Sequence, residues 1–197
     1  MSQNTVRKKP RLNRKFRFQL LKDWIVTHFE KCRVADVGGG KGLLAYLLLM
    51  EGWETTVIEP NTTKNLVKYR EVQSKKRIKL QDNDWSKLDR IESTLFPEIA
   101  DNFDLLVGLH AHGVNMEIIR ICAERKRDFV LLPCCVIDEP IIKKPNVDWF
   151  GSLVDYARNL GLDPKVGQLN FKGKNRIIYS DNFFGKRSEI IPRGTSG

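Results

Sequence analysis

The chain has few cysteines and no long apolar run, and both shortages limit the classes of protein to which it can belong. Its 197 residues include four cysteines, with no Cys-x-x-Cys spacing: Cys32, Cys122, Cys134 and Cys135. Four thiols in a chain of this length do not form the disulfide framework of a small secreted domain, so we expect reduced thiols and a cytoplasmic protein. No apolar stretch reaches the roughly 18 residues that a membrane helix needs, so we expect neither a membrane span nor a secretory signal.

The chain is also short of acidic residues. The 34 Lys and Arg outnumber the 24 Asp and Glu, which gives a formal net charge of +10. No acid precedes Asp23, and residues 1–15 form a basic arm; a second basic group lies at Lys172, Lys174 and Arg176. This excess favours a polyanionic partner such as nucleic acid, although a basic protein without such a partner carries the same charge.

Apolar patterns along the chain predict alternating strands and helices. We expect strands at residues 33–37, 55–59, 78–80, 103–109 and 129–133. We expect helices at residues 16–29, 41–51, 61–73, 85–95, 115–126 and 147–160. Strands that alternate with helices predict a parallel sheet with helices on its faces.

The end of the chain breaks this rhythm. Residues 166–171 and 176–180 are predicted strands, and the four residues that join them allow only an antiparallel hairpin. The whole pattern predicts a doubly wound, Rossmann-like α/β sheet, mostly parallel with a C-terminal antiparallel hairpin. This ending is typical of class I methyltransferases and separates them from most dinucleotide-binding domains. We expect one domain over residues 16–180, preceded by the arm and followed by a basic tail over 181–197.

A glycine-rich loop follows the first predicted strand. Its pattern is Asp-x-Gly-x-Gly-x-Gly, formed by Asp36, Gly38, Gly40 and Gly42. Glycine lets the backbone turn sharply and approach a ligand closely. The carboxyl end of a strand is also where open α/β sheets bind ligands. A dinucleotide loop needs a third glycine at position 43, which is leucine here, so a pyrophosphate ligand is disfavoured.

S-adenosylmethionine suits such a loop, because it has no phosphate and needs acceptors for its ribose hydroxyls and amino groups. Glu59 ends the second predicted strand, about 20 residues after the loop, where an acid accepts both ribose hydroxyls. Asp84 follows the short third strand and is expected to accept from the adenine amino group, with Trp85 or Ile58 packing on the ring. A different nucleotide, or none, is the alternative, since Rossmann-like folds host many functions.

Three segments carry a resemblance to known families. Residues 33–60 resemble methyltransferase motif I and the acidic end of the second strand. Gly108–Gly113 (Gly-Leu-His-Ala-His-Gly) and Leu131–Cys135 (Leu-Leu-Pro-Cys-Cys) resemble RNA methyltransferase-like families. Over roughly residues 16–180 the chain is similar to the tRNA (uracil-2′-O)-methyltransferase family, most selectively at Pro-Cys-Cys. It is much shorter than the eukaryotic members, and Gly108–Gly113 is equally similar to another methyltransferase-like family.

The resemblance implies a methyltransferase that uses S-adenosylmethionine, with RNA as its partner. A tRNA is the expected substrate, and the ribose 2′-oxygen of uridine is the expected acceptor. His110 and His112 follow the fourth predicted strand and are candidates for a catalytic base or a substrate-positioning group, with loop shaping as the alternative. Pro133, Cys134 and Cys135 follow the fifth strand and are expected to line the substrate pocket.

Other polar residues are assigned no role in the reaction. Asp104 begins a strand, at the wrong end of the sheet; Asp138 and Glu139 are candidates for a base, but exposed loop acids are the favoured interpretation. No metal site is predicted, because the histidines and the paired cysteines lack the standard spacing of zinc ligands. The alternative functions are a small-molecule or protein methyltransferase and a non-catalytic RNA-binding module.

Overall fold

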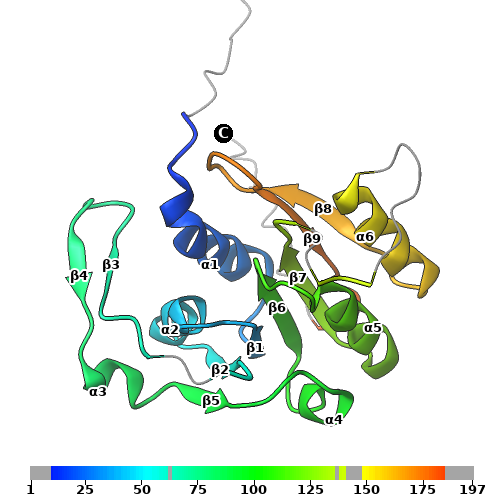
Figure 1. The fold of residues 1–197 in the computed structure, drawn as a ribbon, viewed down its shortest axis with the longest axis horizontal. Coiled ribbons are helices and arrows are strands. Elements are labelled where there is room, and N and C mark those ends of the chain that lie inside the picture. Colours follow the sequence, from blue (N-terminus) through cyan, green and yellow to red (C-terminus); the bar gives the residue numbers. More distant parts are fainter. Residues whose placement is uncertain (1–9, 62–63, 136–137, 141–147, 185–197) are drawn as a thin grey trace, which may run out of the picture.

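The computed structural model describes residues 10–61, 64–135, 138–140 and 148–184, and its main feature is a seven-stranded sheet (Figure 1). The strands are β1 (Arg33–Val37), β2 (Glu54–Ile58), β5 (Asp89–Ile91), β6 (Leu105–Leu109), β7 (Asp128–Leu132), β8 (Lys165–Gln168) and β9 (Arg176–Tyr179). Their order across the sheet is β5-β2-β1-β6-β7-β9-β8. Neighbouring strands are parallel, except that β9 runs antiparallel to β7 and β8. The predicted fold class, including its antiparallel ending, is confirmed.

Helices cover both faces of this sheet (Figure 1). On one face lie α1 (Arg17–His28), which follows the short helix η1 (Arg14–Phe16), and α2 (Leu43–Met50). The other face holds α4 (Pro97–Ala100), α5 (Asn115–Arg125) and α6 (Trp149–Asn159). Successive side chains of a strand point to opposite faces, so Val34 packs with α1 and α2 while Ala35 packs with α5 and α6.

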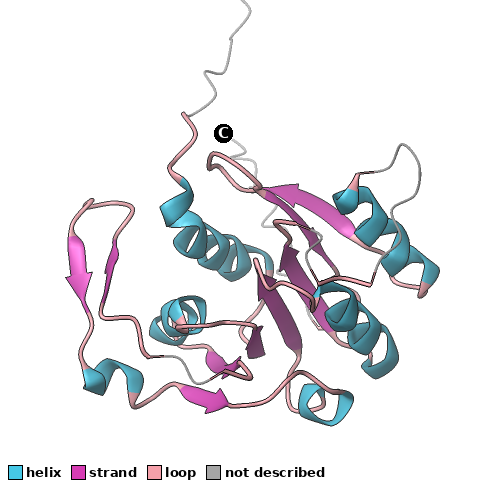
Figure 2. Ribbon diagram, in the orientation of Figure 1, coloured by secondary structure: helices cyan, strands magenta, loops and turns pink. Residues whose placement is uncertain are grey.

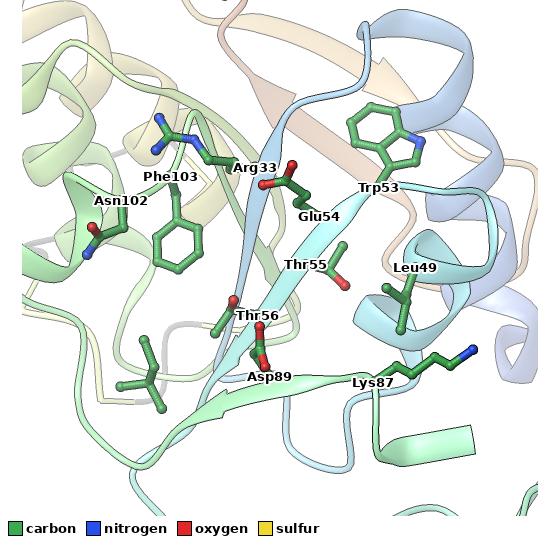
Figure 3. Close-up of a pocket in the computed structure, with 11 residues that line it drawn as sticks. Arg33, Leu49, Trp53, Glu54, Thr55, Thr56, Lys87, Asp89, Asn102 and Phe103 are labelled. Atoms are coloured by element: carbon green, nitrogen blue, oxygen red, sulfur yellow. The ribbon is translucent and has the colours of Figure 1, made fainter. Parts of the chain in front are cut away.

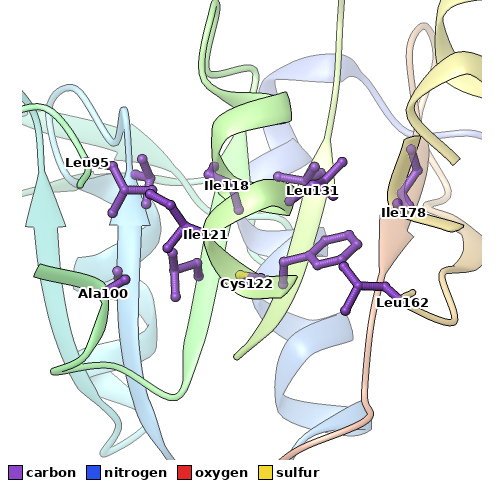
Figure 4. Close-up of a cluster of buried hydrophobic side chains, with 14 of the residues drawn as sticks. Leu95, Ala100, Ile118, Ile121, Cys122, Leu131, Leu162 and Ile178 are labelled. Atoms are coloured by element: carbon purple, nitrogen blue, oxygen red, sulfur yellow. The ribbon is translucent and has the colours of Figure 1, made fainter. Parts of the chain in front are cut away.

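The core beneath α5 consists of buried apolar side chains. Ile118, Ile121 and Cys122 of α5 meet Leu131 of β7 and Ile178 of β9, and all five side chains are fully buried (Figure 4). Truncating one such side chain to alanine typically costs about 2–5 kcal/mol. This packing fixes the carboxyl ends of β6 and β7, which carry the histidine and cysteine segments.

The segment between β2 and β6 differs from the prediction. Residues 62 and 63 lie outside the described residues, and the described remainder of the predicted helix 61–73 contains no helix. Instead, β3 (Lys68–Arg70) and β4 (Arg77–Lys79) form an antiparallel hairpin away from the main sheet (Figure 2). Gln19 of α1 stabilises it, because its Nε2 donates to the Arg70 carbonyl at 2.9 Å and its Oε1 accepts from the Val72 amide at 2.7 Å. This tertiary contact overrides local helix propensity.

The third strand of the main sheet was also predicted at the wrong place. The predicted strand 78–80 belongs to the outlying hairpin, and the predicted helix 85–95 contains β5, which pairs with β2. Only one turn of helix, α3 (Asp82–Trp85), precedes β5. Strands of three residues carry too little periodicity to be distinguished from helix or loop.

Residues near both ends of the described chain pack against the domain. The Leu12 amide donates to the Asn170 carbonyl at 3.0 Å, and the Lys172 amide donates to the Leu12 carbonyl at 2.9 Å. Asp128 accepts backbone amides from residues 182–184. Residues 1–9 and 185–197 lie outside the described residues. None of the helices in the described ranges has the length and apolar character that a membrane crossing requires.

Candidate functional site

The glycine loop leaves β1 with three residues in left-handed backbone geometry. The φ angles of Gly38, Gly40 and Gly42 are 65°, 51° and 77°, a region that other residues enter at a cost. A Cβ on Gly38 would lie 2.9 Å from the Cβ of Ala111, so this glycine is needed for packing. A Cβ on Gly40 would meet nothing within 4 Å, so Gly40 faces open space.

That open space is a cavity of about 290 Å³ at the carboxyl ends of β1 and β6. From the sheet side it is lined by the loop residues 38–41, Asp36, Leu109 and His110, and from α1 by Arg17 and Phe18. The cavity therefore lies where open α/β sheets bind their ligands. Its walls combine backbone, apolar side chains and charged groups of both signs.

Asp36 is the buried acid of this cavity, with 2% of its surface exposed. Its carboxylate accepts the backbone amide of Ala45 in the first turn of α2 at 3.3 Å. Burial raises the pKa of Asp36 to about 7, although the Ala45 amide and the Arg90 guanidinium both act to lower it. A cation bound beside Asp36 would favour its ionised form.

Glu59 and Arg90 hold the loop from either side. The Gly40 amide donates to the Glu59 carboxylate at 3.1 Å, and the Arg90 Nη1 donates to the Gly40 carbonyl at 3.0 Å. The structure thus brings together Asp36, Gly38, Gly40 and Glu59, as the motif predicts. The Glu59 carboxylate also accepts the backbone amide and the side-chain amide of Asn61, at 3.2 and 3.3 Å, so about one of its roughly four acceptor positions remains for a ligand hydroxyl.

Three other predicted site residues do not line this cavity: Gly42, Asp84 and Trp85. A Cβ on Gly42 would meet the side chains of Arg90, Leu88 and Val57 within 3.2 Å, so this glycine serves the packing of α2. Asp84 accepts the Gln81 amide at 2.7 Å within the capping box of α3, and Trp85 packs on Tyr46 at 5.2 Å between ring centroids.

The expected position of Asp84 and Trp85 after the third strand of the main sheet is wrong, because they follow a strand of the outlying hairpin; their contact with adenine stays a prediction. The residue that directly follows the third strand of the main sheet is Glu92. The preceding residue, Ile91, accepts the Glu59 amide at 3.1 Å, so this strand end lies beside Glu59.

His110 lines the cavity in a left-handed conformation, with φ 54°. The backbone of Lys174 lies beside its imidazole, and its Nε2 is buried with no partner among the described residues. Burial, followed by the positive charges of Arg17 and Arg14, lowers the pKa of His110 to about 4. The imidazole is therefore neutral at pH 7, which makes it a weak base but a good hydrogen-bonding group.

The three residues expected in a substrate pocket lie close to one another. Pro133 and Cys134 line a second cavity of about 150 Å³, together with Trp149, Phe150 and Lys174 of the C-terminal half. Cys135 lies beside Cys134, with 3.4 Å between the sulfur atoms. Because the Lys174 backbone, which lines the second cavity, lies beside His110, which lines the first, the two cavities are neighbours.

His112 and His110 contact different groups. It is exposed, and its Nε2 lies 3.1 Å from the Sγ of Cys134 and 3.3 Å from that of Cys135. Burial and the neighbouring Cys135 thiol raise the pKa of Cys134 to about 11. The two predicted catalytic histidines therefore have different surroundings, and only His110 lines the first cavity.

Four charged or apolar residues of the site were missed from the sequence. Lys41 lies inside the glycine motif, which is a signal that points to it directly. Arg90 was hidden because its segment was predicted to be helical. Arg17 and Phe18 carry no sequence signal, because only tertiary packing brings the start of α1 over the loop.

A wider cavity of about 540 Å³ lies at the opposite edge of the sheet (Figure 3). Its lining includes Arg33, Glu54 and Asp89, which are the first residues of β1, β2 and β5. Asp104 pairs with Arg33 there at 2.7 Å, and this partner lowers the pKa of Asp104. Strand carboxyl ends bind the ligands of such sheets, so the glycine-loop cavity is the candidate ligand site, and Asp104 lies at the opposite end of the sheet, as predicted.

Comparison with known proteins supports the fold assignment. No family model matches the sequence, and no curated protein sequence matches it. The structure is similar to magnesium protoporphyrin IX methyltransferase (ChlM) from Synechocystis PCC 6803 with bound SAM, at a TM-score of 0.55 and 15% identity, over 88% of this chain and 79% of that chain. It is similar to a ribosomal protein L11 methylase from Lactobacillus delbrueckii subsp. bulgaricus, at a TM-score of 0.54 and 11% identity, over 84% and 76% of the two chains.

A third similar structure is CalO1, a methyltransferase in calicheamicin biosynthesis, in its SAH-bound form. Its TM-score is 0.43 at 15% identity, and the match covers 77% of this chain but only 49% of the CalO1 chain. The first two likenesses, at TM-scores above 0.5, show that the chain has the Rossmann-like fold of class I methyltransferases. At identities this low, the likeness extends to the fold alone.

Proposed function

We propose that this protein is an S-adenosylmethionine-dependent methyltransferase. The observation that carries the proposal is the open left-handed position at Gly40, in a loop with Asp36 on one side and Glu59 on the other. Two carboxylates match a ligand that bears a sulfonium, an amino group and ribose hydroxyls but no phosphate. The fold is also that of ChlM, whose structure holds SAM.

Bound in this cavity, S-adenosylmethionine supplies a methyl group that is already activated by the sulfonium. Alignment of the acceptor and exclusion of water are then the main tasks of the protein. Phe18 and Leu109 provide apolar walls, and the loop fixes the position of the ligand. His110 is neutral at pH 7, and its buried Nε2, which has no partner among the described residues, can accept a hydrogen bond from a hydroxyl that reaches it.

We infer that the methyl acceptor is RNA, with tRNA as the substrate and a uridine ribose 2′-oxygen as the acceptor atom. Support comes from the charge of +10 and from basic side chains that lie around both cavities: Arg14, Arg17, Lys41 and Lys174. None of these four is paired with a carboxylate in the described part of the chain, so they are available to phosphates. Reduced thiols agree with a cytoplasmic site of action.

Aromatic groups in the second cavity suit a nucleotide substrate. The guanidinium of Arg176 lies 3.8 Å from the ring centroid of Phe150, and Trp149 lines the same cavity. Stacking on aromatic rings and guanidinium planes is a common way to recognise an unstacked RNA base. The second cavity is therefore our candidate for the base next to the methylated nucleotide.

The test is a calorimetric titration with S-adenosylmethionine, followed in the same sample by transfer of labelled methyl to total tRNA at several salt concentrations. We expect binding, and label in tRNA whose yield at limiting RNA falls as salt rises. Label that appears only in protein or small-molecule acceptors would refute the RNA substrate and favour the alternative methyltransferases. Absence of binding by folded protein would refute the cofactor assignment.

A further inference from the structure

Two cysteines and a histidine converge beside the second cavity. The Nε2 of His112 lies 3.1 Å from the Sγ of Cys134 and 3.3 Å from the Sγ of Cys135, and the sulfur atoms are 3.4 Å apart. The three donor atoms all lie within 4.8 Å of one another. Within the described ranges, no other group of three His, Cys, Asp or Glu side chains gathers in this way.

These separations agree with tetrahedral chelation of one ion. Around tetrahedral zinc, with bonds of about 2.3 Å to sulfur and about 2.05 Å to nitrogen, two sulfurs lie roughly 3.8 Å apart and a sulfur–nitrogen pair roughly 3.6 Å apart. If the three donor atoms move apart by a few tenths of an ångström, both the sulfur–sulfur and the sulfur–nitrogen distances match these values. Linear coordination by two sulfurs would place them about 4.6 Å apart, which is much further from the observed geometry.

The backbone around the three donors is fixed from both sides. His112 follows β6 and the cysteines follow β7, and these strands are parallel neighbours, with the His110 amide donating to the Leu132 carbonyl at 3.1 Å. Beyond the cysteines, the Glu139 carboxylate accepts the amides of Asn115 at 2.9 Å and Met116 at 3.1 Å. That contact ties the loop after β7 to the start of α5, so both donor segments are held in place.

We propose that His112, Cys134 and Cys135 bind a thiophilic divalent cation, with Zn²⁺ as the preferred ion. Two thiolates and one imidazole are a ligand set that zinc accepts while it keeps a fourth position for water or substrate. His112 is exposed, so the ion can enter from solvent, and Cys134 also lines the second cavity. A polar group in that cavity therefore lies next to the bound ion. Binding releases the two thiol protons to solvent.

The cation site is testable without any methyl-transfer assay, so its failure is distinct from failure of the proposed function. The full chain, stripped with a chelator under reducing conditions, is titrated with Zn²⁺ against a chromophoric competitor and separately with Co²⁺. We expect one equivalent of either ion, and for Co²⁺ a thiolate charge-transfer band in the near ultraviolet. Cys134→Ser, Cys135→Ser and His112→Gln should each weaken binding by on the order of 100-fold, since even outer-shell changes can cost about 10–100-fold.

Cys32→Ser is the matched control, because Cys32 is a half-buried thiol that packs in the α1–α2 core. It should bind Zn²⁺ as tightly as the unchanged chain. Because His112 is exposed, His112→Gln should fold even if a cysteine variant does not, and circular dichroism checks this. Any of three results would overturn the proposal. They are the lack of a thiolate band, equal Zn²⁺ affinity in His112→Gln and Cys32→Ser, and a chain that forms a Cys134–Cys135 disulfide and binds no ion.

Discussion

Replacing Gly40 by aspartate tests the cofactor assignment most directly. A side chain at this position enters the cavity without clashing with the protein, since a Cβ there meets nothing within 4 Å. The cost to the fold is therefore mainly that of left-handed backbone, at φ 51°, which is about 1 kcal/mol and corresponds to a Tm shift of roughly 2–4 °C in a chain of this size. The cost to the ligand is larger, because the carboxylate occupies its space. We expect S-adenosylmethionine affinity to fall at least about 100-fold, which equals roughly 2.8 kcal/mol.

Gly161→Asp is the control for backbone cost. Gly161 is exposed, has φ 80°, and a Cβ there also meets nothing within 4 Å, but it lies just beyond the end of α6 and lines neither cavity. Both variants should lose similar stability in thermal unfolding, and only Gly40→Asp should lose heat of binding in calorimetry. A folded Gly40→Asp variant with unchanged affinity would refute the cofactor assignment.

Three further predictions follow from burial, packing and charge. The pKa of Asp36 is raised to about 7, so the folded state holds a proton that the unfolded state releases near pH 4. The free energy of unfolding should therefore fall as pH rises from about 4 to about 7, and urea titrations of Asp36→Asn should lack this contribution to the pH dependence. Gly42→Ala should cost about 2–3 kcal/mol in the same assay, because φ there is 77° and a Cβ would lie 3.1 Å from Leu88 and 3.2 Å from Val57; a loss below that of Gly40→Ala would contradict the packing role. Lys174→Ala should weaken tRNA binding uniformly across sequences and reduce the salt slope by about 1, as measured by filter binding, whereas an unchanged slope would remove Lys174 from the RNA surface.

The glycine loop was predictable because the residues that define it are contiguous in the sequence. Asp36, Gly38 and Gly40 lie on one strand–loop–helix unit, and Glu59 directly follows the neighbouring strand, so sequence spacing translates directly into position. The long apolar strands β1, β6 and β7 were predictable for the same reason, since each is buried over most of its length.

The segment from β3 to β5 was not predictable in this way. Its strands are three residues long, and the β3–β4 hairpin depends on Gln19, which comes from α1, far away in the sequence. The approach of His112 to Cys134 was hidden for a related reason. These residues are 22 positions apart, and only the parallel pairing of β6 with β7 brings them together.

The hydrogen bonds between Leu12 and the loop at residues 170–172 have a consequence for biosynthesis. They join the first described segment of the chain to its last hairpin, and this segment leads into α1, whose Arg17 and Phe18 line the glycine-loop cavity. During translation the glycine loop and α1 emerge early, but the segment before α1 lacks these hydrogen-bond partners until the final hairpin has left the ribosome. The wall that α1 gives the cavity should therefore be anchored last, and ligand affinity should rise late in synthesis.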